Sequence, residues 1–378
     1  METLHFLQQY WWLLVSLLGA LLVFLLFVQG GQTMLYGTAR TEEEKKYLIS
    51  VLGHKWELTF TTLVTFGGAA FASFPLFYST SFGGAYWLWI AILFLFVIQA
   101  VSYEFRNKAS NLLGARTYDL FLYLNGLFGT ILLGIAVGTL FSGGSYFMDK
   151  LNITEASNPT ISYWANDWMG LDAIAVPFNL LLGVIVFLAA RTLGFLFILN
   201  GLSGKYKEMG ERAGVQLKVS GISFVLLFVV FLIALFLRTG CEVNPETGII
   251  TPVKYKYFLN FIELVWPLVL LLAGVVLVLA GLAGAMFMPK SFLGKKSFYI
   301  TGAGVVFAVW SILVCAAFNN TAYFPSLVNL QDSLTLYNSS SSLFTLKVMA
   351  YVSLAIPVVL WYIIIVWRKM SGGKHVEY

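Results

Sequence analysis

The chain has 378 residues, of which 59% are hydrophobic and only 11% are charged, and its mean hydropathy is +0.82. Because soluble domains carry about 25% charged residues, this composition excludes an ordinary soluble domain and indicates an integral membrane protein. The formal net charge of +5 does not indicate a nucleic-acid-binding protein, because the basic residues are concentrated in alternate loops.

Nine apolar segments are long enough to cross a bilayer, which takes roughly 20 helical residues. In chain order they cover residues 10–29, 58–80, 84–105, 117–142, 173–200, 215–238, 257–287, 297–319 and 343–367. The first segment lacks a basic flank and a small-x-small cleavage site, so we expect a retained helix and not a signal peptide. The sequence therefore predicts an all-α integral membrane protein with nine transmembrane helices.

The basic residues predict how the helices are oriented. The loops after the first, third, fifth and seventh helices, together with the C-terminal tail, hold 17 of the 23 lysines and arginines. By the positive-inside rule these loops face the cytoplasm. The N-terminus is then outside and the C-terminus inside, which an odd number of crossings requires.

The first and fifth helices start on the same side, so helices one to four and five to eight run in the same sense. We predict two four-helix bundles in parallel repeat, at residues 1–142 and 173–320, separated by an outer loop at 143–172. Residues 321–378 are predicted to form another outer loop, the ninth helix and a cytoplasmic tail.

The residue types that bind metals or carry out catalysis are scarce. The three histidines, His5, His54 and His375, lie outside the apolar segments, whereas a haem or transition metal within the membrane normally needs His, Met or Cys ligands there. We therefore expect this chain to contribute no catalytic residue, metal ligand or cofactor ligand. Cys241 and Cys315 are both predicted near the outer surface, where a disulfide is an alternative to the favoured pair of unpaired thiols.

Glu57 is the first candidate for proton chemistry. It follows Trp56 at the cytoplasmic start of the second helix. A carboxyl group that enters the membrane shifts its pKa upward, toward values at which it exchanges protons at neutral pH. The alternative is a structural one, because an acid in the first turn of a helix is favoured by the helix dipole.

Further charged residues lie near the helix ends. Glu104 and Arg106 are two positions apart and do not face each other on a helix, so we expect each to pair with Glu57, Asp119 or another loop, or to be solvated at the helix end. Arg191 is expected to extend toward the interface or to pair with an acid. Glu263 and Lys347 lie at similar depth near the outer face and form a candidate ion pair.

Five blocks of the chain, in order, resemble subunit II of the cytochrome bd-type quinol oxidases. They are Tyr10–Leu14 (YWWLL); Trp56-Glu57 with Gly67–Pro75 (GGAAFASFP); Val101–Lys108 (VSYEFRNK); Pro177-Phe178 with Gly183; and a C-terminal block with Phe324-Pro325, Ser333–Tyr337 (SLTLY), Asn338–Ser341 and Thr345–Met349 (TLKVM). One block is a weak indication, but five in order are a specific one.

The resemblance implies a respiratory oxidase of the bacterial cytoplasmic membrane that oxidises a quinol and reduces O2 to water with four electrons. It implies a heterodimer in which subunit I carries two b-type haems and one d-type haem, and protons are taken from the cytoplasm. A structural quinone and a small accessory subunit are further expectations that the residues do not locate. A secondary transporter and a purely structural partner subunit are the alternatives, although the midplane is too poor in charge to favour a transporter.

The resemblance also implies a proton route through this subunit. Glu57 matches the acid of the family's cytoplasm-facing route. Many members have an acid near the end of the first helix, where this chain has Gln32, which can relay hydrogen bonds but cannot titrate. The predicted route therefore comprises Glu57, Gln32, Glu104 and Arg106.

Overall fold

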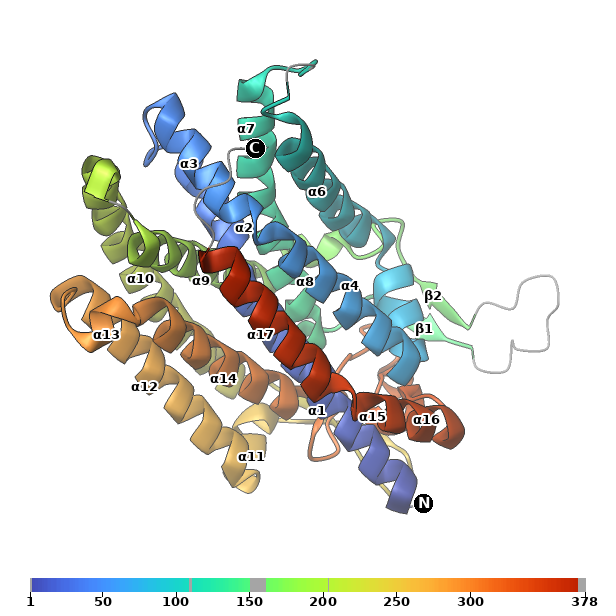
Figure 1. The fold of residues 1–378 in the computed structure, drawn as a ribbon. Coiled ribbons are helices and arrows are strands. Elements are labelled where there is room, and N and C mark those ends of the chain that lie inside the picture. The colour runs from blue at the N-terminus through green and yellow to red at the C-terminus, as the bar shows by residue number, and fades with distance from the viewer. Residues whose placement is uncertain (1, 109–110, 150–160, 203, 373–378) are drawn as a thin grey trace.

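The protein is a bundle of long helices capped at one end by two short hairpins (Figure 1). The computed structural model describes residues 2–108, 111–149, 161–202 and 204–372. Within these ranges eight helices are long and apolar enough to cross a membrane, and a ninth is counted if Glu42–Ser73 and Pro75–Gly83 form one bent span. The predicted all-α membrane fold is confirmed, and the predicted nine spans correspond to the higher count.

The first half of the chain contains α1 Glu2–Leu25, α2 Phe27–Gln32, η1 Thr33–Leu35, α3 Glu42–Gly53, α4 Trp56–Ser73, α5 Pro75–Phe77, η2 Tyr78–Gly83, α6 Tyr86–Phe105, α7 Ala115–Leu124, η3 Asn125–Gly129 and α8 Thr130–Ser142. The segments η2 and η3 are π-helical. The second half contains η5 Leu171–Ala175, α9 Pro177–Gly201, η6 Gly204–Tyr206, α10 Lys207–Phe236, α11 Lys256–Glu263, α12 Val265–Phe287, α13 Phe292–Lys295, α14 Ser297–Ala317, η7 Leu330–Asp332, α15 Leu336–Ser339, α16 Leu343–Ser353 and α17 Ile356–Gly372.

Three of the nine predicted helices are interrupted next to a proline. The chain bends by 119° between α4 and the segment that begins at Pro75. The α11–α12 break precedes Pro267, and the α16–α17 break precedes Pro357. Proline has no backbone N–H and its ring clashes with the preceding turn, so it is tolerated only in the first turn of a new helix. The prediction of continuous helices was therefore wrong at these three places.

The outer loops contain strands that the sequence did not predict. Tyr146–Met148 (β1) pairs with Ser162–Trp164 (β2), and Gly240–Val243 (β3) pairs with Ile250–Val253 (β4), both antiparallel. The segment 318–341 joins the two hairpins, since it forms bridges to Gly144 and to Glu242. The outer segments of both halves therefore form one connected layer. Residues 150–160 of the predicted outer loop, and the predicted tail from residue 373, lie outside the described residues.

The two halves interlock through α9, which packs against α2, α8 and α10. The crossing of α2 and α9 is close because both helices carry glycine there. A Cβ atom added to Gly30 would lie 1.9 Å from the carbonyl oxygen of Ala190, and one added to Gly194 would lie 2.4 Å from the backbone nitrogen of Gly31. Small residues permit such contacts between membrane helices. The grouping into two parallel four-helix repeats stays a prediction.

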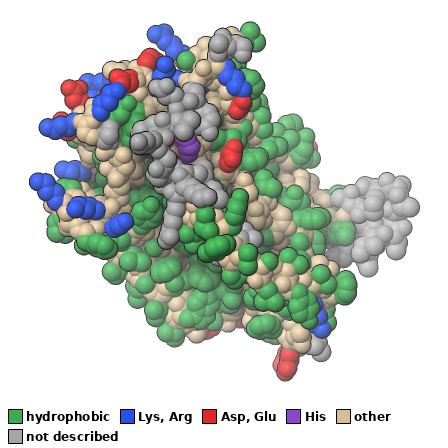
Figure 2. Space-filling view, in the orientation of Figure 1, with side chains coloured by type: hydrophobic (Ala, Val, Ile, Leu, Met, Phe, Trp, Pro, Cys, Tyr) green, Lys and Arg blue, Asp and Glu red, His purple; other side chains and the backbone are tan. Residues whose placement is uncertain are grey.

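Charged side chains gather at one end of the molecule. Figure 2 shows lysine, arginine and acidic side chains together over α3, α13 and the start of α10, while hydrophobic side chains cover most of the remaining visible surface. We call this region the charged end. It is the end that the sequence predicts to face the cytoplasm.

Candidate functional site

A buried ion cluster joins three helices at the charged end. Arg106 follows the last residue of α6, and its Nε lies 2.5 Å from Oδ1 of Asp119 on α7. Both side chains are only 1% exposed. Arg106 Nη2 also lies 3.2 Å from Oε2 of Glu42, and Lys45 Nζ lies 3.3 Å from Oδ2 of Asp119. Of the partners predicted for Arg106, the structure therefore shows Asp119 and a residue of another loop, Glu42 on α3.

The positive charge of Arg106 in this cluster is fixed. Burial lowers the pKa of Arg106, but its hydrogen bonds and attraction to Asp119 and Glu42 raise that pKa above its ordinary value overall. A guanidinium group does not deprotonate in proteins. Arg106 therefore holds α3 and α7 against α6, and it can influence a proton only through its positive charge.

Glu57 and Glu104 are exposed acids in the chain as described. Glu57 lies in the first turn of α4 and forms no ion pair with any described residue. Glu104 is 63% exposed and pairs with Lys108 one turn further along. Pairing of Glu104 with Glu57 or Asp119 was therefore a wrong prediction, because its position near the end of α6 points it to solvent. The solvated alternative is confirmed for Glu104.

Gln32 is linked to the start of α4 through the side chains of Tyr103 and Trp56. Its Nε2 donates to the hydroxyl of Tyr103 at 3.1 Å. The Tyr103 ring stacks on Trp56, with 5.9 Å between centroids and 9° between planes. Since Trp56 directly precedes Glu57, this contact joins the buried end of α2 to the turn that carries the exposed carboxylate.

A pair of amide side chains, Gln29 and Gln99, lies one turn further into the bundle than Gln32 and Tyr103. The sequence did not identify this pair as a functional feature. Gln29 Nε2 donates to Oε1 of Gln99 at 3.2 Å, so α2 and α6 are joined twice. Asn125, in the π-helical segment η3, is also fully buried, and η3 packs on both α2 and α6. The available signal was an amide side chain within an apolar segment, but only the fold shows that three separate segments bring such side chains together.

Arg191 on α9 has neutral partners. It donates to Thr33 Oγ1 at 2.9 Å and to Gln216 Oε1 at 2.7 Å, and its guanidinium carbon lies 5.2 Å from the centroid of the Phe195 ring. The predicted pairing with an acid is therefore wrong, and the extension of Arg191 toward the interface stays a prediction. A hydroxyl from η1 and an amide from α10 satisfy the donors without an acid, so the side chain remains within the bundle.

The predicted pairs near the outer end are not formed. Glu263 accepts a hydrogen bond from Asn319, and Lys347 is exposed on α16, which packs on α1 and α4 and not on α11. Cys241 and Cys315 are both buried and unbonded, which excludes the disulfide. Burial raises the pKa of the Cys241 thiol, although Arg238 partly offsets this effect.

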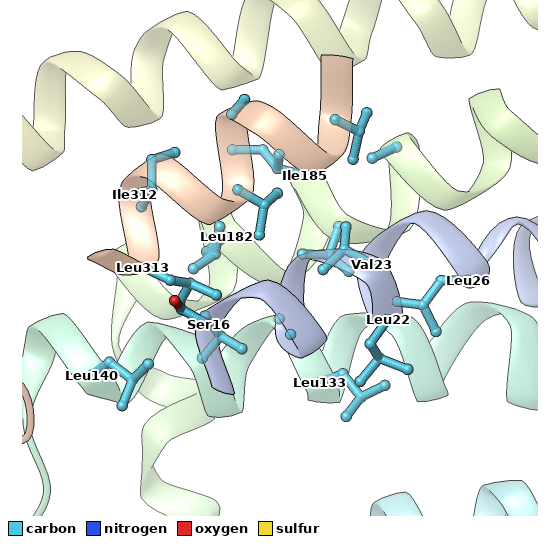
Figure 3. Close-up of a pocket in the computed structure, with 18 of the residues that line it drawn as sticks. Ser16, Leu22, Val23, Leu26, Leu133, Leu140, Leu182, Ile185, Ile312 and Leu313 are labelled. Carbon is cyan, nitrogen blue, oxygen red and sulfur yellow. The ribbon is translucent and has the colours of Figure 1, made fainter. Parts of the chain in front are cut away.

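An apolar cavity of about 220 Å³ lies between the halves. Figure 3 shows leucine, isoleucine and valine side chains of α1, α8, α9 and α14 around it, with Ser16 as the labelled hydroxyl. Leu26, one turn from Gln29, lines its edge. Further into the bundle, the buried polar side chains of the charged end are therefore followed by the apolar side chains of this cavity.

The described residues do not fit an intramembrane haem or metal held by this chain. His5 packs edge-on against Tyr337, with ring centroids 4.9 Å apart, and His54 Nδ1 lies 2.5 Å from the Ser50 carbonyl oxygen at the end of α3. Within the described part, no three His, Cys, Asp or Glu residues are grouped to hold a metal ion. His375 lies outside the described residues.

These features define a class of protein: a multi-pass helical membrane subunit with a polar interior at one end. Within that class the family is specific. The family model described as cytochrome bd terminal oxidase subunit II matches residues 7–370, and the chain belongs to this family. It is therefore a subunit of a terminal oxidase, which is an oxidoreductase complex with at least one further subunit. This membership excludes the secondary-transporter alternative.

Relatives of similar length support the assignment. The chain is 27% identical to the probable cytochrome oxidase subunit 2 of Haemophilus influenzae, over 97% of this chain and 95% of that protein. It is 26% identical to the cytochrome bd ubiquinol oxidase subunit 2 of Bacillus subtilis, over 94% and 92%. The bd oxidase structure from Geobacillus thermodenitrificans matches with a TM-score of 0.62 at 15% identity, over 99% of this chain and 100% of that one, which shows the same fold.

Proposed function

We propose that the chain is the non-haem subunit II of a bd-type quinol oxidase and contributes to proton uptake from the cytoplasm. In this proposal subunit I carries two b-type haems and one d-type haem, oxidises the quinol and reduces O2 to water. The names of the Bacillus subtilis and Escherichia coli relatives, both ubiquinol oxidase subunits, support the quinol assignment. The contact that joins Gln32, Tyr103 and Trp56 beside Glu57 is the observation that carries the proton role.

The charges of the chain support an orientation with the charged end in the cytoplasm. Basic residues are enriched in loops that face the cytoplasm, and the charged end holds most of the visible lysine and arginine side chains. With this end inside, the N-terminus lies outside and protons reach the subunit from the cytoplasm. The exposed carboxylate of Glu104, near the end of α6, is then available to collect protons from water.

We infer that the haem-bearing subunit packs on the face of α4 that points away from the rest of this chain. This face exposes Glu57, Thr61, Thr65 and Gly68 at helical spacing. Small and hydroxyl-bearing residues permit close packing between membrane helices, and a Cβ added to Gly68 meets nothing within 4 Å in this chain. A carboxylate exposed to lipid is costly, whereas at a subunit interface Glu57 can receive a proton and pass it across.

The roles within the site differ. Glu57 is the titrating group, and Gln32 relays hydrogen bonds without titrating. Arg106 keeps α3, α6 and α7 together through the Asp119 ion pair. A purely structural role for the whole subunit is the remaining alternative, and the buried Arg106–Asp119 pair supports it equally well. Glu57 therefore distinguishes the two.

The test is a Glu57→Gln variant of the assembled oxidase in vesicles, which keeps the size of the side chain and removes its titration. We expect proton uptake during turnover to fall by about tenfold, equivalent to ~1.4 kcal/mol on the limiting barrier. Glu263→Gln is the matched control, because Glu263 is also an exposed acid at a helix end. Full proton uptake in the Glu57 variant would rule out Glu57 as a titrating relay.

A further inference from the structure

Four buried amide side chains at the charged end have unmet hydrogen-bonding capacity. Gln29, Gln32, Gln99 and Asn125 are each 0% exposed, and we call them the amide site. Five of their polar atoms have no hydrogen-bond partner: Gln29 Oε1, Gln32 Oε1, Gln99 Nε2, and both Nδ2 and Oδ1 of Asn125. Thirteen such side-chain atoms occur in the described part of the chain, so five of them are concentrated in one place.

The four residues lie on three segments that pack against one another, α2, α6 and η3. Gln29 is hydrogen-bonded to Gln99, and Gln32 lies one turn from Gln29 on the same helix. A Cβ added to Gly126, the neighbour of Asn125, would lie 2.4 Å from the carbonyl oxygen of Gln29 and 3.3 Å from Cβ of Gln32. The backbones of η3 and α2 are therefore in contact at this point.

The side chain of Asn125 lies beside Gly129, at the place where η3 packs on Phe96 of α6. Its Nδ2 lies 3.2 Å from the position of a Cβ on Gly129, and that position is 3.7 Å from the ring of Phe96. Phe96 is one turn before Gln99 on α6. Asn125 also lies in a π-helical turn, a rare conformation that occurs frequently at functional sites.

The unmet atoms identify the kind of ligand. Three of them are acceptors and two are amide donors. A metal cation would leave the donors unmet, and an anion would leave the acceptors unmet. Exchanging the oxygen and nitrogen of both Gln29 and Gln99 preserves one free donor and one free acceptor in that pair. Water both donates and accepts, and buried water typically makes about three hydrogen bonds to groups of this kind.

We propose that the amide site binds a small cluster of buried water molecules and that these waters, held by uncharged amides, extend the proton route inward from Tyr103. The second half of this inference rests on the proposed function, whereas the water site does not. Leaving five buried polar atoms unpaired is strongly unfavourable, so occupancy by water removes a cost that the chain otherwise bears.

Radiolytic labelling of the assembled oxidase tests the water site directly, because hydroxyl radicals formed from bound water modify side chains that bulk water does not reach. We expect Phe96 to be oxidised faster than Phe74, which is equally buried but packs against Trp12 and Tyr323. Equal labelling of Phe96 and Phe74 would overturn the proposal, because it means that the amides pair directly in a dry site.

Asn125→Leu removes two of the five unmet atoms at similar volume, and it is expected to reduce Phe96 labelling to the Phe74 rate. Asn179→Leu, another buried amide with one unmet atom, is the matched control and should leave Phe96 labelling unchanged. If the Asn125 variant fails to assemble, Gln99→Met provides the same test on α6. Unchanged Phe96 labelling in the variant that assembles would contradict the site.

Proton uptake separates the two halves of the inference. Severalfold slower uptake in the Asn125→Leu oxidase, together with lost labelling, supports the relay. Lost labelling with normal uptake overturns the relay, and it leaves the role of Glu57 untouched because Glu57→Gln is measured separately.

Discussion

Arg106 and Asp119 show how one side-chain pair can fix the frame of a site. Replacing Arg106 by leucine leaves Asp119 as a buried carboxylate with only Lys45 beside it. We expect a loss of about 3 kcal/mol in the free energy of unfolding, since removing one partner of a buried pair costs ~3–5 kcal/mol. Thermal unfolding of the purified protein in detergent measures this loss.

The exposed pair on the same helix is the control for that measurement. Lys108→Gln removes the Glu104 ion pair, whose side chains are 47% and 63% exposed, and such pairs are worth about 0–1 kcal/mol. Equal destabilisation by the Arg106 and Lys108 variants would mean that the Arg106–Asp119 pair is not buried as described.

The two cysteines provide a chemical test at the residue scale. We expect two reactive thiols after unfolding without reductant, because both cysteines are unbonded. In the folded protein the thiols, 9% exposed at Cys241 and 1% at Cys315, should be protected. Because burial raises the pKa of Cys241, its alkylation should increase only as the pH rises above the ordinary thiol range. The measurement is mass spectrometry after maleimide treatment, and an absence of thiols in the unfolded protein would indicate a disulfide.

At the scale of elements, the crossing of α2 and α9 is the most constrained contact. Gly30→Ala places a Cβ 1.9 Å from the carbonyl oxygen of Ala190. The helices must separate, and we expect a loss of about 1–3 kcal/mol, typical of overpacking. Gly214→Ala is the control, because a Cβ there meets nothing within 4 Å and alanine is the better helix former. The account of this crossing fails if both variants unfold at the same temperature.

The sequence predicted the apolar helices well but not their interruptions. The length of an apolar segment identifies a membrane span. Whether the helix breaks before a proline such as Pro75 depends on whether the chain can turn there and still pack against its neighbours. Hydropathy predicts a loop where α3 lies, although Thr41 and Glu44 form a capping box that is readable as S/T-x-x-E. The sequence did not predict the hairpins, because their strands are only three or four residues long.

The candidate site was predictable only in part. Glu57 was identified because an acid at the start of an apolar helix is costly, and Gln32 because it lies where the family that the chain resembles often has an acid. The sequence limited the possible partners of Arg106 to a few acids, but it did not show which of them forms the ion pair. Asn125 and the Gln29–Gln99 pair depend on three segments meeting at one place, and no local spacing in the sequence encodes that meeting.

At the scale of the whole molecule, we propose a subunit that supplies packing and a proton route to a haem-bearing partner. The described histidines lie at helix ends, and the polar interior at the charged end consists of amides, hydroxyls and one ion cluster. In this proposal the exposed α4 face, with Glu57 at its charged end, binds the partner. Electron transfer is proposed to take place in the partner, and this chain is proposed to act on the protons.

One measurement tests this division of roles most directly: purification in mild detergent through a tag on this chain, followed by haem spectra and quantification of haem per subunit. We predict a stoichiometric partner that carries the b-type and d-type absorbance, and no haem on this chain when the two are separated. Haem that remains with this polypeptide alone would contradict the account.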